Sequence, residues 1–142
     1  MLKQKVRVVL DTNVVVSALL FENSTPGRAL QKALSHTSIC VTNEVLEEYR
    51  RVLSRRKFAK YVDSGARLKF LSELNLVVDL VQAKAHDSSL PLRDSSDSIF
   101  IDAALGANAD CLISGDEDLL VLKPYFAIPI LTAAEFLDLE IK

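Results

Sequence analysis

The feature that most constrains the fold of this chain is the regular alternation of short β-rich runs with longer amphipathic segments. Alternation of this kind is typical of a parallel sheet that helices cover on both faces. The sequence therefore predicts an α/β protein with three layers, α/β/α, and a central parallel sheet of four to five strands. The expected strands are residues 6–10, 38–41, 76–80, 110–113 and 128–131.

Helix start signals stand between the expected strands. Thr25 precedes Pro26, which places a capping hydroxyl before a proline at the first helical position and predicts a helix to about His36. The other expected signals are Thr42 or Asn43 before the next helix, a capping box of Ser114 with Glu117, and a capping box of Thr132 with Glu135 that opens a last helix ending near Leu139.

Composition limits the class of protein. A chain of 142 residues that is 49% hydrophobic fits one domain, residues 1–142. The 17 basic and 19 acidic residues give a net charge of −2, so a polyanion would have to be held by a local basic patch or by metal. No apolar run approaches the roughly 20 residues of a membrane span, and the N-terminus leads directly into a strand. We expect a cytoplasmic protein in which Cys40 and Cys111 are small hydrophobic residues.

Four acidic residues lie at the ends of expected strands or on the helices just after them: Asp11, Glu48, Asp97 and Asp116. In an open α/β sheet, ligands bind outside the carboxyl ends of the strands, so these acids can converge at one crevice. Crowded carboxylates raise one another's pKa unless a cation neutralises them. Because Mg²⁺ and Mn²⁺ favour oxygen ligands, the pattern predicts a site for one of these ions.

Four segments, in order along nearly the whole chain, resemble the motifs of the PIN domain family, a nuclease fold that includes the VapC-type toxins of bacterial toxin–antitoxin modules. Each motif alone is a weak signal, and the four together are a strong one. They are Asp11-Thr12-Asn13 after the first strand, Glu48 in residues 47–53, Arg93-Asp94-Ser95-Ser96-Asp97, and Ser114-Gly115-Asp116-Glu117-Asp118 after the fourth strand.

The resemblance implies a PIN-like fold and a divalent-metal-dependent ribonuclease that hydrolyses phosphodiester bonds of single-stranded RNA. The chemistry is compatible, because one or two metal ions can activate water, neutralise the phosphate and stabilise the leaving oxygen. Asp11, Glu48, Asp97 and Asp116 are then the expected catalytic metal ligands. The family also implies an antitoxin protein as a possible partner and a homodimer.

Each expected ligand has a structural alternative. Asp11 could be a helix cap, and Asp94 and Asp97 would both be stabilised by a helix N-terminus without metal. Asp94 and Asp118 are expected as secondary ligands, and Gly115 is expected to allow a tight turn before Asp116. The remaining alternatives concern Asn13 or Thr12, which could hold phosphate or position Asp11; Ser114, which could support Asp116, touch phosphate or only cap; and Glu44, which could assist Glu48 or lie on the surface.

A basic run at residues 50–60 begins two positions after Glu48. It has two readings of equal weight, a solvated helix end or a phosphate track that leads RNA into an acidic site. In the second reading Arg55, Arg56 and Lys57 bind substrate. His36 and His86 stand at no ligand spacing and are expected on the surface.

Two other functions compete with the nuclease. A PIN-fold module that binds RNA or a partner without catalysis is the alternative, although a cluster of negative charge has no use in a protein that only binds phosphates. A phosphatase of the haloacid dehalogenase type would need a second aspartate two residues after Asp11, where the chain has Asn13.

Overall fold

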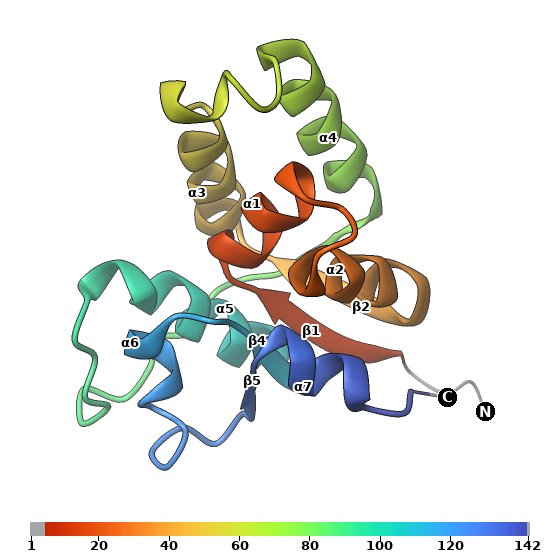
Figure 1. Ribbon diagram of the computed structural model, residues 1–142. Helices are drawn as coiled ribbons and strands as arrows, with labels where there is room; N and C mark the ends of the chain where they lie inside the picture. The colour runs from red at the N-terminus through yellow and green to blue at the C-terminus, as the bar shows by residue number, and fades with distance from the viewer. Residues whose placement is uncertain (1–4, 142) are drawn as a thin grey trace.

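The computed structural model describes residues 5–141, which are built around a five-stranded sheet of order β3-β2-β1-β4-β5 (Figure 1). All neighbouring strands are parallel. This arrangement confirms the predicted α/β class and the sheet of four to five strands. The strands are β1 Val6–Leu10, β2 Thr37–Val41, β3 Asp79–Leu80, β4 Cys111–Ile113 and β5 Ile130–Leu131.

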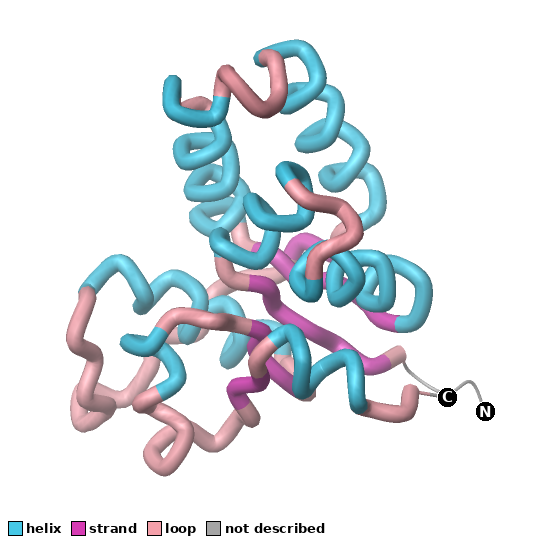
Figure 2. The backbone as a smooth tube through the Cα atoms, in the orientation of Figure 1, coloured by secondary structure: helices cyan, strands magenta, loops and turns pink. Residues whose placement is uncertain are grey.

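Helices cover both faces of the sheet (Figure 2). α5 packs against β1, β2 and β4, while α2 packs on β2 and α7 on β5, with α2 and α7 in mutual contact. α3 contacts α1, α4 and α5, and with α4 it extends beyond the sheet. The helices are α1 Thr12–Leu20, α2 Thr25–His36, α3 Asn43–Leu53, α4 Ser64–Val77, α5 Ser98–Ala107, α6 Glu117–Leu120 and α7 Ala133–Asp138, with 3₁₀ turns η1 Arg56–Phe58 and η2 Ser95–Asp97.

β1 lies at the centre of the sheet, and its apolar sequence follows from that position. Val8, Val9 and Leu10 are completely buried, because side chains on both faces of a central parallel strand meet helices. The buried apolar residues form one cluster that extends from the sheet into the helical layers. Cys40 and Cys111 belong to this cluster as unpaired thiols within the described chain, which agrees with their predicted role.

The order of the strands places a crevice at one edge of the sheet. From β1 the chain proceeds outward through β2 and β3, then returns to add β4 and β5 on the other side of β1. Leu10 and Ile113 are register partners, so the segments that follow β1 and β4 leave the sheet side by side. Connections that diverge from adjacent strands open a binding crevice between them.

Two sequence-based expectations about element boundaries were wrong. The fourth helix continues through Leu76 and Val77, so only Asp79–Leu80 of the expected strand 76–80 pairs with β2. The α2 cap is Ser24, whose hydroxyl accepts a hydrogen bond from the Gly27 amide, and Thr25 is already helical. The α3 cap at Thr42 and the capping box of Thr132 with Glu135 are present as predicted.

None of the helices among residues 5–141 has the length and apolar character that crossing a membrane requires.

Candidate metal centre

A cleft of about 200 Å³ lies at the carboxyl edge of the sheet, beside the ends of β1 and β4. Segments far apart in sequence line it: the start of α1, one face of α3, η2, the start of α5, and α6. Seven of the predicted site residues line this one cleft: Asp11, Asn13, Glu48, Arg55, Asp94, Asp97 and Asp116.

Asp11 is both a structural cap and a cleft residue. Its carboxylate accepts a hydrogen bond from the Val14 amide (3.0 Å) at the start of α1 and another from the Ser114 hydroxyl. Burial raises the pKa of Asp11, the two hydrogen bonds lower it, and the negative charge of Asp116 raises it further. Asp11 therefore both caps α1 and lines the cleft, so its structural role and its expected site role do not exclude each other.

Ser114 holds the two strand ends together. Its hydroxyl donates to Asp11 and accepts from the Asp116 amide at 2.9 Å. The side chain is completely buried, so its geometry favours support of the two acids over contact with a substrate. The predicted capping box of Ser114 with Glu117 was wrong, because this hydroxyl is already engaged and Asp116 caps α6 instead.

The turn before Asp116 does not depend on glycine. Gly115 has no positive φ, and a Cβ built on it would meet no atom within 4 Å. The expectation that Gly115 permits a special turn is therefore not supported by the backbone. Asp116 is aimed by Ser114 and by its own hydrogen bond from the Asp118 amide at 2.9 Å.

Asp97 is surrounded by other acidic side chains of the site. Carboxylate oxygens of Asp94, Asp97 and Asp118 lie within 4.8 Å of one another, and the side chain of Asp97 is only 5% exposed. Burial, followed by the charges of Asp116, Asp94, Asp118 and Asp11, raises the pKa of Asp97 to about 7. Its Oδ2 atom has no hydrogen-bond partner among residues 5–141.

Asp94 differs from Asp97 because protein groups already satisfy it. Its Oδ1 accepts hydrogen bonds from the amide and the hydroxyl of Ser96, at 2.9 and 2.8 Å. These bonds hold the pKa of Asp94 below its usual range. Asp94 therefore brings a stable negative charge to the cluster, at the start of η2.

The donor set fits a hard divalent cation. A buried carboxylate oxygen with no partner is costly, and a metal ion would satisfy it while it neutralises the surrounding acids. All side chains in the cluster offer oxygen, the ligand that Mg²⁺ and Mn²⁺ prefer. Thr12 adds a second buried oxygen, Oγ1, that lacks a partner within the described residues and lies at the cleft wall.

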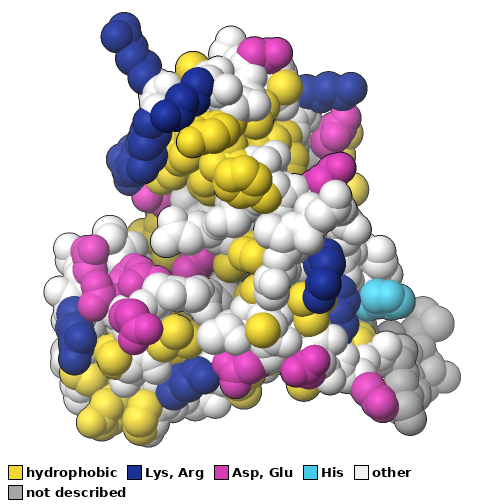
Figure 3. Space-filling view, in the orientation of Figure 1, with side chains coloured by type: hydrophobic (Ala, Val, Ile, Leu, Met, Phe, Trp, Pro, Cys, Tyr) yellow, Lys and Arg dark blue, Asp and Glu magenta, His cyan; other side chains and the backbone are white. Residues whose placement is uncertain are grey.

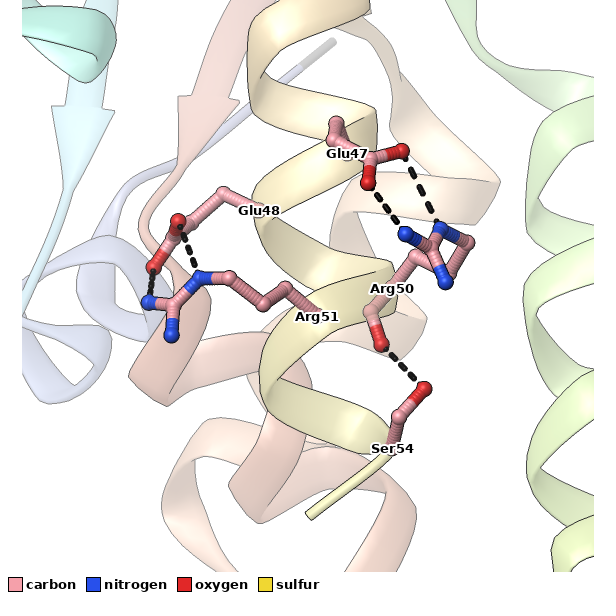
Figure 4. Close-up of polar contacts among 5 residues, drawn as sticks. All are labelled: Glu47, Glu48, Arg50, Arg51 and Ser54. Carbon is pink, nitrogen blue, oxygen red and sulfur yellow. Dashed lines mark hydrogen bonds and ion pairs between the residues drawn. The ribbon is translucent and has the colours of Figure 1, made fainter.

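Glu48 lines the cleft with an ion-pair partner that the sequence analysis missed. Arg51 donates to both of its carboxylate oxygens, at 3.2 and 2.6 Å (Figure 4). A signal for this pair was available, because residues three apart on a helix are neighbours. Tyr49, completely buried beside Glu48, donates its hydroxyl to the Leu10 carbonyl and so ties α3 to the end of β1. Glu44 is exposed and does not line the cleft.

The basic run divides among different surfaces. Arg51 and Arg55 line the cleft, while Arg50 pairs with Glu47 in a groove between α3 and α4. Arg56 and Lys57 are exposed on η1 and do not line the cleft. Figure 3 shows Lys and Arg side chains gathered at the upper left, over the end of α3, above the Asp and Glu side chains of the α5 and α6 region.

The two histidines differ in their surroundings. His36 is exposed at the end of α2, as expected. His86 is only partly exposed: its Nδ1 lies 2.7 Å from Asp102 Oδ1, and its amide donates to the same oxygen. His86 keeps a partly exposed side chain, and its pairing with Asp102, 16 residues away on α5, is a contact of which spacing in the sequence gives no signal.

Comparisons with known proteins identify the family and the fold of this chain. The sequence matches the PIN domain family over residues 7–118. The chain therefore belongs to the PIN domain family, whose members are generally nucleases that use divalent metal ions. It is 32% identical over 123 residues to the uncharacterized protein MJ1680 of Methanocaldococcus jannaschii, covering 85% of this chain and 77% of that protein.

Two solved structures share the fold at low sequence identity. One is VapBC2 from Rickettsia felis bound to a DNA fragment from their promoter, with a TM-score of 0.62, 15% identity, and coverage of 89% of this chain and 98% of that chain. The other is PAE2754 from Pyrobaculum aerophilum, with a TM-score of 0.59, 14% identity, and coverage of 91% and 85%. Both likenesses concern the fold alone.

Proposed function

We propose that the protein is a divalent-metal-dependent endoribonuclease that hydrolyses phosphodiester bonds of single-stranded RNA. The observation that carries the proposal is Asp97, a buried carboxylate with one unpartnered oxygen among the other acids of the cleft. Membership of the PIN domain family supports nuclease chemistry. Single-stranded RNA as substrate rests on the motif resemblance.

The proposed ligands of Mg²⁺ or Mn²⁺ are Asp11, Glu48, Asp97 and Asp116, with Asp94 and Asp118 as further acids of the site. When bound, the cation supplies an activated water and neutralises charge on the phosphate. Asp11 is held in place for this role by its hydrogen bonds from Ser114 and Val14. Asn13 is exposed at the cleft and offers an amide donor to a phosphate, and Arg55 offers a positive charge there.

We also propose that the protein is the toxin of a toxin–antitoxin pair. The likeness of its fold to VapBC2 supports this role. Exposed apolar side chains on α4, Leu68 and Leu76 among them, offer a surface that a protein partner would cover. Purification from a host that also expresses the neighbouring gene would test for a stable complex.

The alternative, a PIN-fold module that binds RNA or a partner without catalysis, is less favoured by the cleft. Without a cation, the acids Asp11, Asp94, Asp97 and Asp116 would repel a phosphate backbone. A protein that only binds RNA gains nothing from such a site.

Cleavage of a mixed pool of single-stranded RNA by purified protein tests the proposal, with Mg²⁺, Mn²⁺ or EDTA. Asp97→Asn is compared with Asp138→Asn, which changes an exposed acid on α7 that does not line the cleft. We expect cleavage that requires metal, is lost in Asp97→Asn and persists in Asp138→Asn. Metal-independent cleavage, or equal activity of both variants, would contradict the proposal.

A further inference from the structure

Two equivalent ion pairs on α3 face different surfaces. Glu48 and Arg51 pair on the side of the cleft, and Glu47 and Arg50 pair on the side of α4 (Figure 4). In both pairs the arginine follows the glutamate by three residues and donates to both carboxylate oxygens through Nε and one terminal nitrogen. The pairs therefore differ mainly in what surrounds them.

The pair in the cleft occupies a group that the site needs. Both oxygens of Glu48 accept from Arg51, so a cation that takes Glu48 as a ligand competes with Arg51 for this carboxylate, and repulsion between the two positive charges favours displacement of the guanidinium. The displacement is inexpensive, because the Arg51 side chain is 56% exposed and exposed ion pairs at this spacing are weak. Asp97, which has no such partner, lies across the same cleft.

Arg51 has the right chemistry to change partners. Its planar guanidinium forms the same two-pronged contact with a carboxylate and with a phosphate. Arg55 lies just beyond the end of α3, before η1, and lines the same cleft, so a phosphate that enters would meet two guanidinium groups.

We propose that Arg51 exchanges partners during substrate binding: it pairs with Glu48 in the metal-free protein and moves to a phosphate of the RNA once a divalent cation takes Glu48. The exchange rests on the proposed function and deepens it. In the metal-free protein, Arg51 neutralises an acid of the cleft, and after the exchange it adds positive charge where the polyanion arrives. Glu47 and Arg50 undergo no exchange, since they face the α3–α4 groove.

The first test measures metal affinity without RNA. Mn²⁺ is titrated into the wild type, Arg51→Gln and Arg50→Gln by calorimetry, with EDTA-treated protein as the start. We expect Arg51→Gln to lower the Kd for Mn²⁺ by about two- to fivefold, the scale of an exposed ion pair. Arg50→Gln, which removes the same charge from the matched pair, is expected to change the Kd by less than about half of that. Equal effects of the two variants would overturn the proposal.

The second test measures RNA binding in the presence of Mn²⁺. A fluorescent single-stranded RNA oligonucleotide with phosphorothioate linkages is titrated by anisotropy, and its integrity is checked on a gel. We expect Arg51→Gln to weaken RNA binding by about five- to tenfold, the loss of one charge-assisted contact, while it strengthens Mn²⁺ binding. Arg51→Lys keeps the charge without the fork and is expected to fall between the wild type and Arg51→Gln.

Opposite changes in metal and RNA affinity distinguish the exchange from a folding defect, which would weaken both. If Arg51→Gln weakened or left unchanged both affinities, the exchange would be excluded, although metal-dependent cleavage by the wild type would still support the nuclease. If the two affinities moved in opposite directions but no RNA was cleaved, the exchange would stand and the nuclease proposal would fail. Absence of Mn²⁺ binding by the wild type would overturn both.

Discussion

Asp97 is strained electrostatically in the metal-free protein, and either a proton or a cation relieves it. Its pKa rises from 3.8 to about 7 on folding. Between these values the folded chain binds a proton at Asp97 that the unfolded chain has released. The contribution of Asp97 to the free energy of unfolding is therefore greatest below about pH 4 and is lost as pH rises to about 7, with an upper limit of about 4 kcal/mol.

We predict that Asp97→Asn stabilises the metal-free protein at pH 8, and that the gain is several times smaller at pH 4.5, which is less than one unit above the unfolded pKa of 3.8. Urea unfolding in EDTA across this range measures the difference between variant and wild type, which should grow with pH. Mn²⁺ at pH 8 should stabilise the wild type more than Asp97→Asn, since only the wild type offers the charged ligand. Parallel pH profiles of the two proteins would contradict the prediction, and Asp138→Asn serves as the control.

The sequence predicted which acids line the cleft more fully than it predicted which groups form hydrogen bonds with them. Asp11 and Asp116 each follow a parallel strand, so the rule that ligands bind outside the carboxyl ends of such strands predicted that they could converge; the adjacency of β1 and β4 came only from the structure. The hydrogen bond of Ser114 could not be predicted, because a hydroxyl at a strand end can cap, bind or support, and only the tertiary structure selects one partner. The absence of a hydrogen-bond partner for one Asp97 oxygen among the described residues could not be predicted either, because it depends on the three-dimensional positions of all neighbouring donors.

At the scale of elements, α4 shows why the expected third strand was misplaced. Leu76, Val77 and Val78 form a β-rich apolar run, yet the first two end a helix with side chains that are 83% and 59% exposed. Continuity with the preceding helical turns outweighed the β propensity of two valines. The described strand that follows pairs over only two residues at the edge of the sheet, a length too short to give a periodic signal.

α5, which begins directly after Asp97 of the acidic cluster, lies in close backbone contact with the segment that follows β3. A Cβ at Gly106 would lie 1.8 Å from the Gln82 carbonyl oxygen, a backbone atom that cannot move aside cheaply. We predict that Gly106→Ala destabilises the protein by about 2 kcal/mol or more, because the clash outweighs the gain in helix propensity. Thermal unfolding measures the change.

Gly65 in α4 is the matched control. A Cβ there would meet only the Asp63 side chain, at 3.4 Å, on an exposed helical face. Gly65→Ala is therefore expected to stabilise the protein by about 0.5–1 kcal/mol through helix propensity. If both alanine variants changed stability in the same direction, backbone contact at Gly106 would not be the controlling feature.

At the scale of the whole molecule, charge is divided between a basic end of α3 and an acidic cleft (Figure 3). We predict that the triple variant Arg55→Gln, Arg56→Gln, Lys57→Gln weakens RNA binding and flattens its dependence on salt. A variant that makes fewer phosphate contacts releases fewer counterions when it binds RNA. Binding is measured by anisotropy from low to high salt, with exposed Arg28→Gln on α2 as the control. An unchanged salt slope would return the basic run to a solvated helix end.

Homodimerisation stays a prediction from the motif resemblance. Exposed Leu68, Leu76 and Val77 make α4 an apolar surface whose burial in a dimer would be favourable. Sedimentation velocity over a range of concentrations should show a dimer that Leu76→Lys weakens. A monomer at every concentration would exclude this prediction.

The hydrogen bond between Ser114 and Asp11 joins residues 103 positions apart, at the ends of β1 and β4. During synthesis, β1 therefore has only β2 as a neighbouring strand while α1 to α5 emerge, and the acid-lined cleft is incomplete until β4 and the residues after it leave the ribosome. If the chain cleaves RNA, this order of assembly separates the nascent polypeptide from its activity, because a partly made chain attached to its own messenger lacks Asp116 and the support for Asp11.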